Sequence, residues 1–248
     1  AVLHLLSLQV RAFGPREQAI LERLADQIAP AVENARLYEQ LQTGIEEKAV
    51  IDEVARIVTS TLDIGQVYER FAAAVKKLVG FDRINISLVD RSAGTYTIKY
   101  LHGLVQPGRR AGDVLALQGT HTERAMVTGE ALITKYAAAD IRLPADPALL
   151  KLGLRSRIMV PLISKRAVIG TLVLHSCRTG AYGEREQTIL RRLADQIAPA
   201  VENARMYDQL QASAEEKAVV DEVARIITST LDIDQVYEKF AAEVKKLV

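Results

Sequence analysis

A stretch of 59 residues occurs twice in this chain, and this duplication limits how the chain can fold more than any other feature. Leu21–Val79 and Leu190–Val248 are offset by 169 positions, and 48 of their 59 paired residues are identical. A fixed internal period indicates how many structural units a chain holds, and this period is as long as a whole domain. We therefore expect a complete domain over residues 44–207, preceded by the end of another domain (1–43) and followed by the start of a third (208–248).

The composition is that of an ordinary globular protein, with 49% hydrophobic residues, 25% charged residues and a formal net charge of +1. A near-neutral chain has no general attraction to nucleic acid or anionic lipid, so we expect neither as a partner. No apolar run approaches the roughly 18 residues that a membrane span needs. The single cysteine, Cys177, excludes an internal disulfide and a multi-cysteine metal site. We expect a cytoplasmic protein.

The duplicated stretch has the spacing of a long helix with two apolar faces. One face repeats at intervals of three and four residues, which is typical of a coiled coil and predicts the dimer contact: Leu21, Leu24, Ile28, Ala31, Ala35 and Tyr38. A second stripe is expected to face the helix's own domain: Ile20, Leu24, Ile28 and Val32. Pro30 predicts a bend. Gly44 predicts a weak helix or a short break near Leu41–Glu47.

Between the two copies the pattern changes to that of short strands. Arg83–Val89 alternates apolar with polar residues, and Thr95–Leu101 follows a short turn, so the pair predicts a hairpin. Ile158–Ile163 and Ala167–His175 predict a second hairpin. Three further short elements are expected between the hairpins: strands at Asp113–Leu117 and Glu130–Thr134, and a helix at Thr120–Thr128. This order indicates an α+β fold with one antiparallel sheet backed by amphipathic helices.

Four segments carry a family resemblance: Phe71–Asp90, His121–Ile133, Arg155–Ser176 and Ala181–Arg205. In this order they resemble a GAF domain. The resemblance implies a sheet of about six strands with helices on one face and a small-molecule pocket on the other. It also implies parallel dimers through the first and last helices, in cytoplasmic sensors. With the duplication, the chain resembles part of a tandem GAF array, as in a multi-GAF sensor histidine kinase of a two-component system.

The pocket, if it is used, is expected under Gly112–Leu154. Six polar residues there are the candidate ligand contacts, able to pair with an anion or a purine edge: His121, Arg124, Lys135, Tyr136, Asp140 and Arg142. The Asn-Lys-Phe-Asp-Glu motif of the cyclic-nucleotide-binding GAF domains is absent. Its absence weighs against cyclic GMP as the ligand.

The sequence leaves three functions open. The first is a regulatory sensor that passes a small-molecule or partner signal along its helices to an output domain outside this chain. The second is a structural spacer that dimerises without a ligand, which the near-identity of the two copies favours. The third, a chromophore- or haem-binding photoreceptor or redox sensor, is disfavoured because Cys177 is not followed by His and the four histidines are scattered. No catalytic motif occurs, so we expect no enzyme activity and can name no cofactor.

Overall fold

The computed structural model describes residues 13–60, 63–135 and 146–229, together with residues 4, 6 and 8. The chain divides into two units, Ala1–Glu53 and Val54–Val248. The first unit holds most of helix α1 (Pro15–Ser60), and the second holds the sheet and the other helices. None of the described helices combines the length and the apolar content that crossing a bilayer requires.

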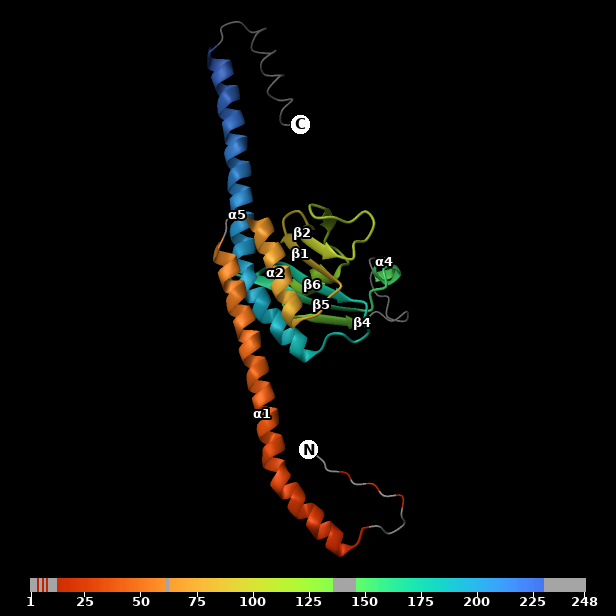
Figure 1. Cartoon of the computed structure of the whole chain (residues 1–248). Helices are drawn as coiled ribbons and strands as arrows, with labels where there is room; N and C mark the ends of the chain where they lie inside the picture. Colours follow the sequence, from red (N-terminus) through yellow and green to blue (C-terminus); the bar gives the residue numbers. More distant parts are fainter. Residues whose placement is uncertain are drawn as a thin grey trace. The chain divides into compact units, whose positions relative to one another are not determined.

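A six-stranded antiparallel sheet lies at the centre of the second unit (Figure 1). The spatial order of its strands is β3-β2-β1-β6-β5-β4. Their bounds are β1 Arg83–Asp90, β2 Thr95–Gly103, β3 Val114–Ala116, β4 Leu132–Lys135, β5 Ser156–Ser164 and β6 Ala167–Ser176. The two predicted hairpins, β1–β2 and β5–β6, are joined side by side through the pairing of β1 with β6. The predicted α+β fold is confirmed.

Two helices cover one face of this sheet. Figure 1 shows α2 (Ile64–Leu78) beside the first part of α5 (Glu184–Ser229), and α5 packs on β5 and β6. The short helices α3 (His121–Thr128) and α4 (Asp146–Lys151) belong to the connection between β3 and β5. Ala125 of α3 packs against side chains of β5 and β6 that line the opposite face. The sheet is therefore covered differently on its two sides.

Local capping fixes where these helices begin. The Asp63 carboxylate accepts hydrogen bonds from the backbone N–H groups of Gly65 (2.9 Å) and Gln66 (3.3 Å) at the start of α2. At the start of α3, the Thr120 hydroxyl accepts from the Glu123 N–H at 3.1 Å. Such caps satisfy N–H groups that the first turn of a helix leaves without a partner.

The strands separate apolar from polar side chains because successive residues point to opposite faces. In β1, Ile84 and Ile86 are fully buried in the core. The residues that alternate with them, Arg83, Asn85 and Ser87, line a cavity on the other face. One face of the sheet thus binds the helices, and the other is available for polar chemistry.

The two copies of the long helix have the same sequence pattern in different surroundings. In α5 the stripe expected to face the domain is buried, with at most 2% of any side chain exposed: Ile189, Leu193, Ile197 and Val201. In α1 the equivalent residues are 41–49% exposed: Ile20, Leu24, Ile28 and Val32. Since the residues are identical, the difference arises from the sheet that packs on α5.

Both long helices are continuous. Helix α1 runs from Pro15 to Ser60 through Gly44, so the segment near Leu41–Glu47 contains no break. Helix α5 runs through the equivalent Ser213. Each helix also contains its internal proline, Pro30 or Pro199.

The matched leucines of the two helices give a direct test of this packing. Leu193→Ala is expected to lower the free energy of unfolding by about 2–5 kcal/mol, because it leaves a cavity in the core. Leu24→Ala, at a position that is 43% exposed, is expected to cost less than about 1 kcal/mol. Urea denaturation followed by circular dichroism would measure both. Equal losses at the two positions would contradict the assignment of Leu193 to the core.

Candidate functional site

A cavity of about 410 Å³ lies in the second unit, on the polar face of the sheet. Strands β1, β2, β5 and β6 form its floor, and the start of α3 and residues Ala148 and Leu149 of α4 form part of its wall. The β2–β3 connection contributes Gln106 and Arg109. Pockets that bind small molecules have volumes of roughly 300–1,000 Å³, so this one can hold a small organic ligand.

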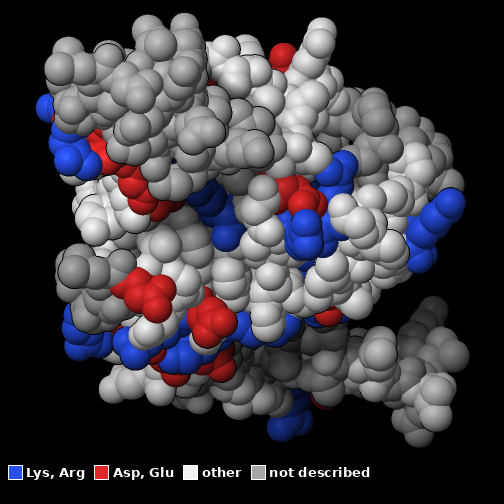
Figure 2. Space-filling view, turned by 90° about the horizontal axis from the view of Figure 1, so that it is seen from above, with Lys and Arg blue, Asp and Glu red and all other residues white. Residues whose placement is uncertain are grey.

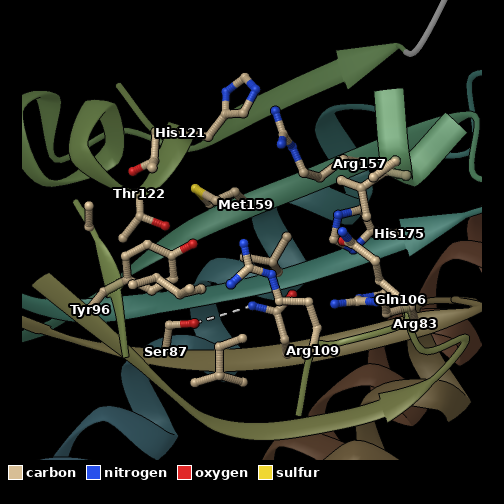
Figure 3. Close-up of a pocket in the computed structure, with 18 of the residues that line it drawn as sticks. Arg83, Ser87, Tyr96, Gln106, Arg109, His121, Thr122, Arg157, Met159 and His175 are labelled. Carbon is tan, nitrogen blue, oxygen red and sulfur yellow. Dashed lines mark hydrogen bonds between the residues drawn. The ribbon is translucent and has the colours of Figure 1, made fainter. Parts of the chain in front are cut away.

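Three basic side chains stand in one row across the floor. Arg83 of β1 pairs in register with His175 of β6, and His175 pairs with Arg157 of β5. None of the three is more than 5% exposed. Because directly opposite residues on neighbouring strands are about 4.5–5.5 Å apart, His175 stands between the two arginines in this row. Figure 3 shows the three side chains together on one side of the cavity.

Hydrogen bonds anchor both arginines of this row. Arg83 Nη1 donates to the Leu104 carbonyl oxygen at 2.9 Å, and Arg157 Nη2 donates to Thr134 Oγ1 at 3.0 Å. Burial lowers the pKa of His175 well below its ordinary value, and the charges of Arg157 and Arg83 lower it further. The imidazole is therefore neutral at pH 7, and the row has its positive charge on the two arginines.

The floor becomes less polar along the strands. The next row towards the middle of the sheet consists of Asn85, Val173 and Met159, which are again paired in register. The Asn85 amide donates to the Ser87 hydroxyl at 3.4 Å, as the dashed line in Figure 3 shows. Met159 and Val173 belong to a buried apolar cluster with Ala125. A ligand in this cavity would contact a charged end and an apolar middle.

A further arginine reaches the cavity from the β2–β3 connection. Arg109 is half-buried. Burial raises the pKa of Tyr96, and the charge of Arg109 opposes part of that rise. Gly108 and Gly112 flank this part of the connection with φ of +76° and +95°, values that glycine adopts without strain. The neighbouring Arg110 does not line the cavity, and its side chain is 89% exposed and lies 3.7 Å from the Asp113 carboxylate.

The predicted ligand contacts fall into three groups. His121 lines the cavity. Arg124 and Lys135 are exposed and are not among the residues that line it. The remaining three lie outside the described residues: Tyr136, Asp140 and Arg142. Contact between any of the six and a ligand stays a prediction.

The sequence-based prediction missed the basic residues of the floor. Arg83, Arg157 and His175 stand at positions that alternate with buried apolar residues in their strands, and this period of two was the signal that could have found them. Nothing comparable marks Arg109, which lies outside the regular elements. Within the described ranges, no group of three or more His, Cys, Asp or Glu side chains is placed to hold a metal ion.

The predicted dimer residues of α1 are exposed in part. Leu24, Ile28 and Tyr38 are 43%, 48% and 74% exposed, Leu21 is half-buried, and Ala31 and Ala35 are exposed. Their α5 counterparts differ along the helix. The first three are buried in the domain core, the next two are half-buried, and the last is 69% exposed: Leu190, Leu193, Ile197, Ala200, Ala204 and Tyr207. Dimerisation through these residues stays a prediction.

Known proteins resemble this chain in sequence and in fold. The family model described as GAF domain matches residues 63–201. The formate hydrogenlyase transcriptional activator of Salmonella typhimurium is 24% identical over 216 residues, which cover 85% of this chain and 31% of that protein. The chain therefore spans about a third of this curated relative.

Two solved structures share the fold. One is the GAF domain of a two-component sensor histidine kinase from Bacillus halodurans, with a TM-score of 0.53, 18% identity, and coverage of 60% of this chain and 99% of that domain. The other is a segment of a methyl-accepting chemotaxis protein, with a TM-score of 0.50, 21% identity, and coverage of 62% and 98%. At these identities the likeness establishes the fold alone.

The buried row predicts a pH-dependent stability. The unfolded chain binds a proton at His175 below about pH 6.5, whereas the folded chain resists that proton because the pKa of His175 is depressed. Lowering the pH below about 6.5 should therefore favour unfolding. His175→Gln should make the fall in unfolding free energy between pH 7 and pH 5 shallower. The variant His102→Gln, at an exposed position, should keep the original slope, and an unchanged slope in His175→Gln would refute this account.

Proposed function

This chain belongs to the GAF domain family, whose model matches residues 63–201, and we propose that it is a non-catalytic sensory module. It binds a small molecule in the cavity and passes the signal along its long helices to an output domain. The observation that carries this proposal is the position of the cavity. Strands β5 and β6 line the cavity on one face of the sheet and pack against α5 on the other face.

The coupling depends on alternation within β5 and β6. Met159 and Val173 face the cavity, while their neighbours Ile158 and Leu172 are fully buried in the core that α5 completes. A ligand that shifts these strands must therefore shift the contacts of α5. Closely packed interfaces change between discrete arrangements rather than deforming gradually, so a small displacement can select one position of the helix.

The named relatives support a regulatory role. One is a transcriptional activator, and the solved domains come from a sensor histidine kinase and a chemotaxis protein. Figure 2 shows basic and acidic side chains lying next to each other on the face drawn there. This mixture and the net charge of +1 support a module whose partners are proteins and a small molecule rather than nucleic acid or a membrane.

The duplication supports a tandem arrangement. We infer that residues 1–43 complete a preceding GAF domain and that 208–248 begin a following one, around the complete domain at 44–207. The exposed stripe at Leu24 and Ile28 would then pack on a preceding sheet as Leu193 and Ile197 pack on this one. In such an array each long helix ends one domain and starts the next.

A second apolar surface supports a homodimer. Three pairs of equivalent residues are 40–74% exposed in both copies of the helix, so the sheet of a complete domain does not cover them: Leu37 and Met206, Tyr38 and Tyr207, Leu41 and Leu210. We call these six residues the outer stripe. Helices with apolar residues on an exposed face associate by packing them together. We propose that two copies of the chain dimerise through the outer stripe.

The alternative function is a spacer that dimerises and sets distance without a ligand. The identity of 48 of 59 residues between the two helical copies favours it, because it suggests selection or recent duplication of the scaffold rather than of individual pockets. The chromophore alternative has less support, since Cys177 is exposed and does not line the cavity.

Ligand binding separates the sensor from the spacer. Native mass spectrometry of protein purified under mild conditions is expected to detect a bound small molecule. Val173→Trp should exclude it by filling the cavity, provided that thermal melting shows a folded protein. Val127→Trp, at a position on α3 that is 76% exposed and outside the cavity, should retain it. A wild-type protein that carries no small molecule would favour the spacer.

The dimer is tested at the outer stripe. Replacing Leu41 and Leu210 together by Glu should convert the dimer to monomer in sedimentation velocity, because buried carboxylates without partners are costly. The matched control replaces the adjacent exposed residues Gln40 and Gln209 by Glu, which adds the same charge outside the stripe. A dimer that survives the Leu substitutions, or dissociates equally with the Gln substitutions, would contradict the assignment.

A further inference from the structure

The chemistry of the cavity identifies the class of its ligand. Among the described residues that line it, three are arginines and none is Asp or Glu. The arginines come from three separate parts of the chain: Arg83 from β1, Arg157 from β5 and Arg109 from the β2–β3 connection. Figure 3 shows all three side chains within the same pocket. The described lining therefore contains positive side chains and no carboxylate, although the chain as a whole has a net charge of only +1.

The two arginines of the floor are held in place before any ligand arrives. Arg83 donates a hydrogen bond to the Leu104 carbonyl, and Arg157 donates one to the Thr134 hydroxyl. The two acceptors lie on either side of the cavity floor. The strand pairing of Arg83 and Arg157 with His175 fixes the positions of their backbones, and the hydrogen bonds restrict their guanidinium groups. A guanidinium binds carboxylate or phosphate oxygens through two parallel N–H groups. A fixed pair of such groups binds an anion without first losing side-chain freedom.

Electrostatics favours an anion at this point. Arg83 and Arg157 stand on the two strands that flank β6. Their like charges repel each other, and the repulsion is stronger where water is excluded. Burial is the main cause of the lowered pKa of His175. The charges of Arg157 and Arg83 lower this pKa further. A cationic ligand would add to this repulsion, whereas an anion would relieve it.

The remaining lining selects an organic anion over a bare inorganic ion. Met159 and Val173 stand next to the basic row, and Ile98 and Leu115 line the cavity from β2 and β3. A volume of about 410 Å³ exceeds that of a single phosphate or carboxylate group. An apolar body attached to the charged group would cover these side chains and displace water from them.

We propose that the ligand of this GAF domain is a small organic anion whose carboxylate or phosphate group binds Arg83, Arg157 and Arg109 and whose apolar part packs on Met159 and Val173. This inference rests on the proposed sensory function and narrows it. Arg109 then closes over the ligand from the connection at Gly108 and Gly112, while the row on the floor sets the position of the charged group.

The test compares ligands of the same shape and different charge. Isothermal titration and thermal shift at low ionic strength would use benzoate, phenyl phosphate and the neutral benzamide. Benzoate or phenyl phosphate should bind and raise the melting temperature, whichever of the two oxyanion groups the site prefers. Benzamide should bind at least about tenfold more weakly, and added NaCl should weaken the anions because salt screens charge.

Two arginine variants distinguish the site from general charge. Arg109→Gln should weaken anion binding by about tenfold to a hundredfold, the usual effect of losing one hydrogen bond to a charged group. Arg110→Gln removes the same charge one residue away, outside the cavity, and should leave binding unchanged. Arg157→Gln should also abolish binding if melting shows it folded. Arg109 is outside the core, so its variant decides the question even if Arg157→Gln unfolds.

Three results would overturn the inference in different ways. Benzamide binding as tightly as benzoate would reject the anionic class but keep a ligand-binding cavity, so the sensory function would stand. Equal loss in the Arg109 and Arg110 variants would place anion binding elsewhere. Failure of both anions and benzamide to bind, with native mass spectrometry showing no small molecule in the purified protein, would reject the sensory function as well.

Discussion

The burial of one helical stripe on one sheet determines most of what this domain can do. Leu193 and Ile197 of α5 are fully buried in the core beneath the sheet, and this packing uses the apolar residues of the strands. The alternating residues must then face the other way, where they form the floor of the cavity. Packing and ligand chemistry therefore share the same strands, and neither can be altered without affecting the other.

The row formed by Arg83, His175 and Arg157 lines the cavity although its burial lowers the stability of the fold. Burying Arg83 and Arg157 on the two strands that flank β6 costs free energy that an apolar pair would avoid. Their anchoring hydrogen bonds and the neutral state of His175 reduce that cost. Perturbed titratable groups in a cavity are a common mark of functional sites. The core on the other face, with residues such as Ile158 and Leu174 fully buried, provides the stability that offsets the row.

The fold was largely predictable because its signals are local. Alternation in β1, the cap at Asp63 and the apolar spacing of the long helices each depend on residues close in sequence. The basic residues of the cavity floor were missed for a physical reason. Arg83 and Arg157 are 74 positions apart and meet only through the pairing of β1 and β5 with β6. His121 was identified as a polar residue of the stretch Gly112–Leu154, and it lines the cavity.

Helix α5 extends far beyond the sheet on which it begins, and this has a consequence for its backbone. Near Leu193 every turn is held by the core, whereas Leu210 and Val220 are 72% and 60% exposed. An unpacked helix in water is only marginally stable. Amide hydrogen exchange should therefore accelerate steadily from the packed end to the exposed end. Any surface that covers the exposed turns would slow this exchange, so order along the helix itself can carry information between its two ends.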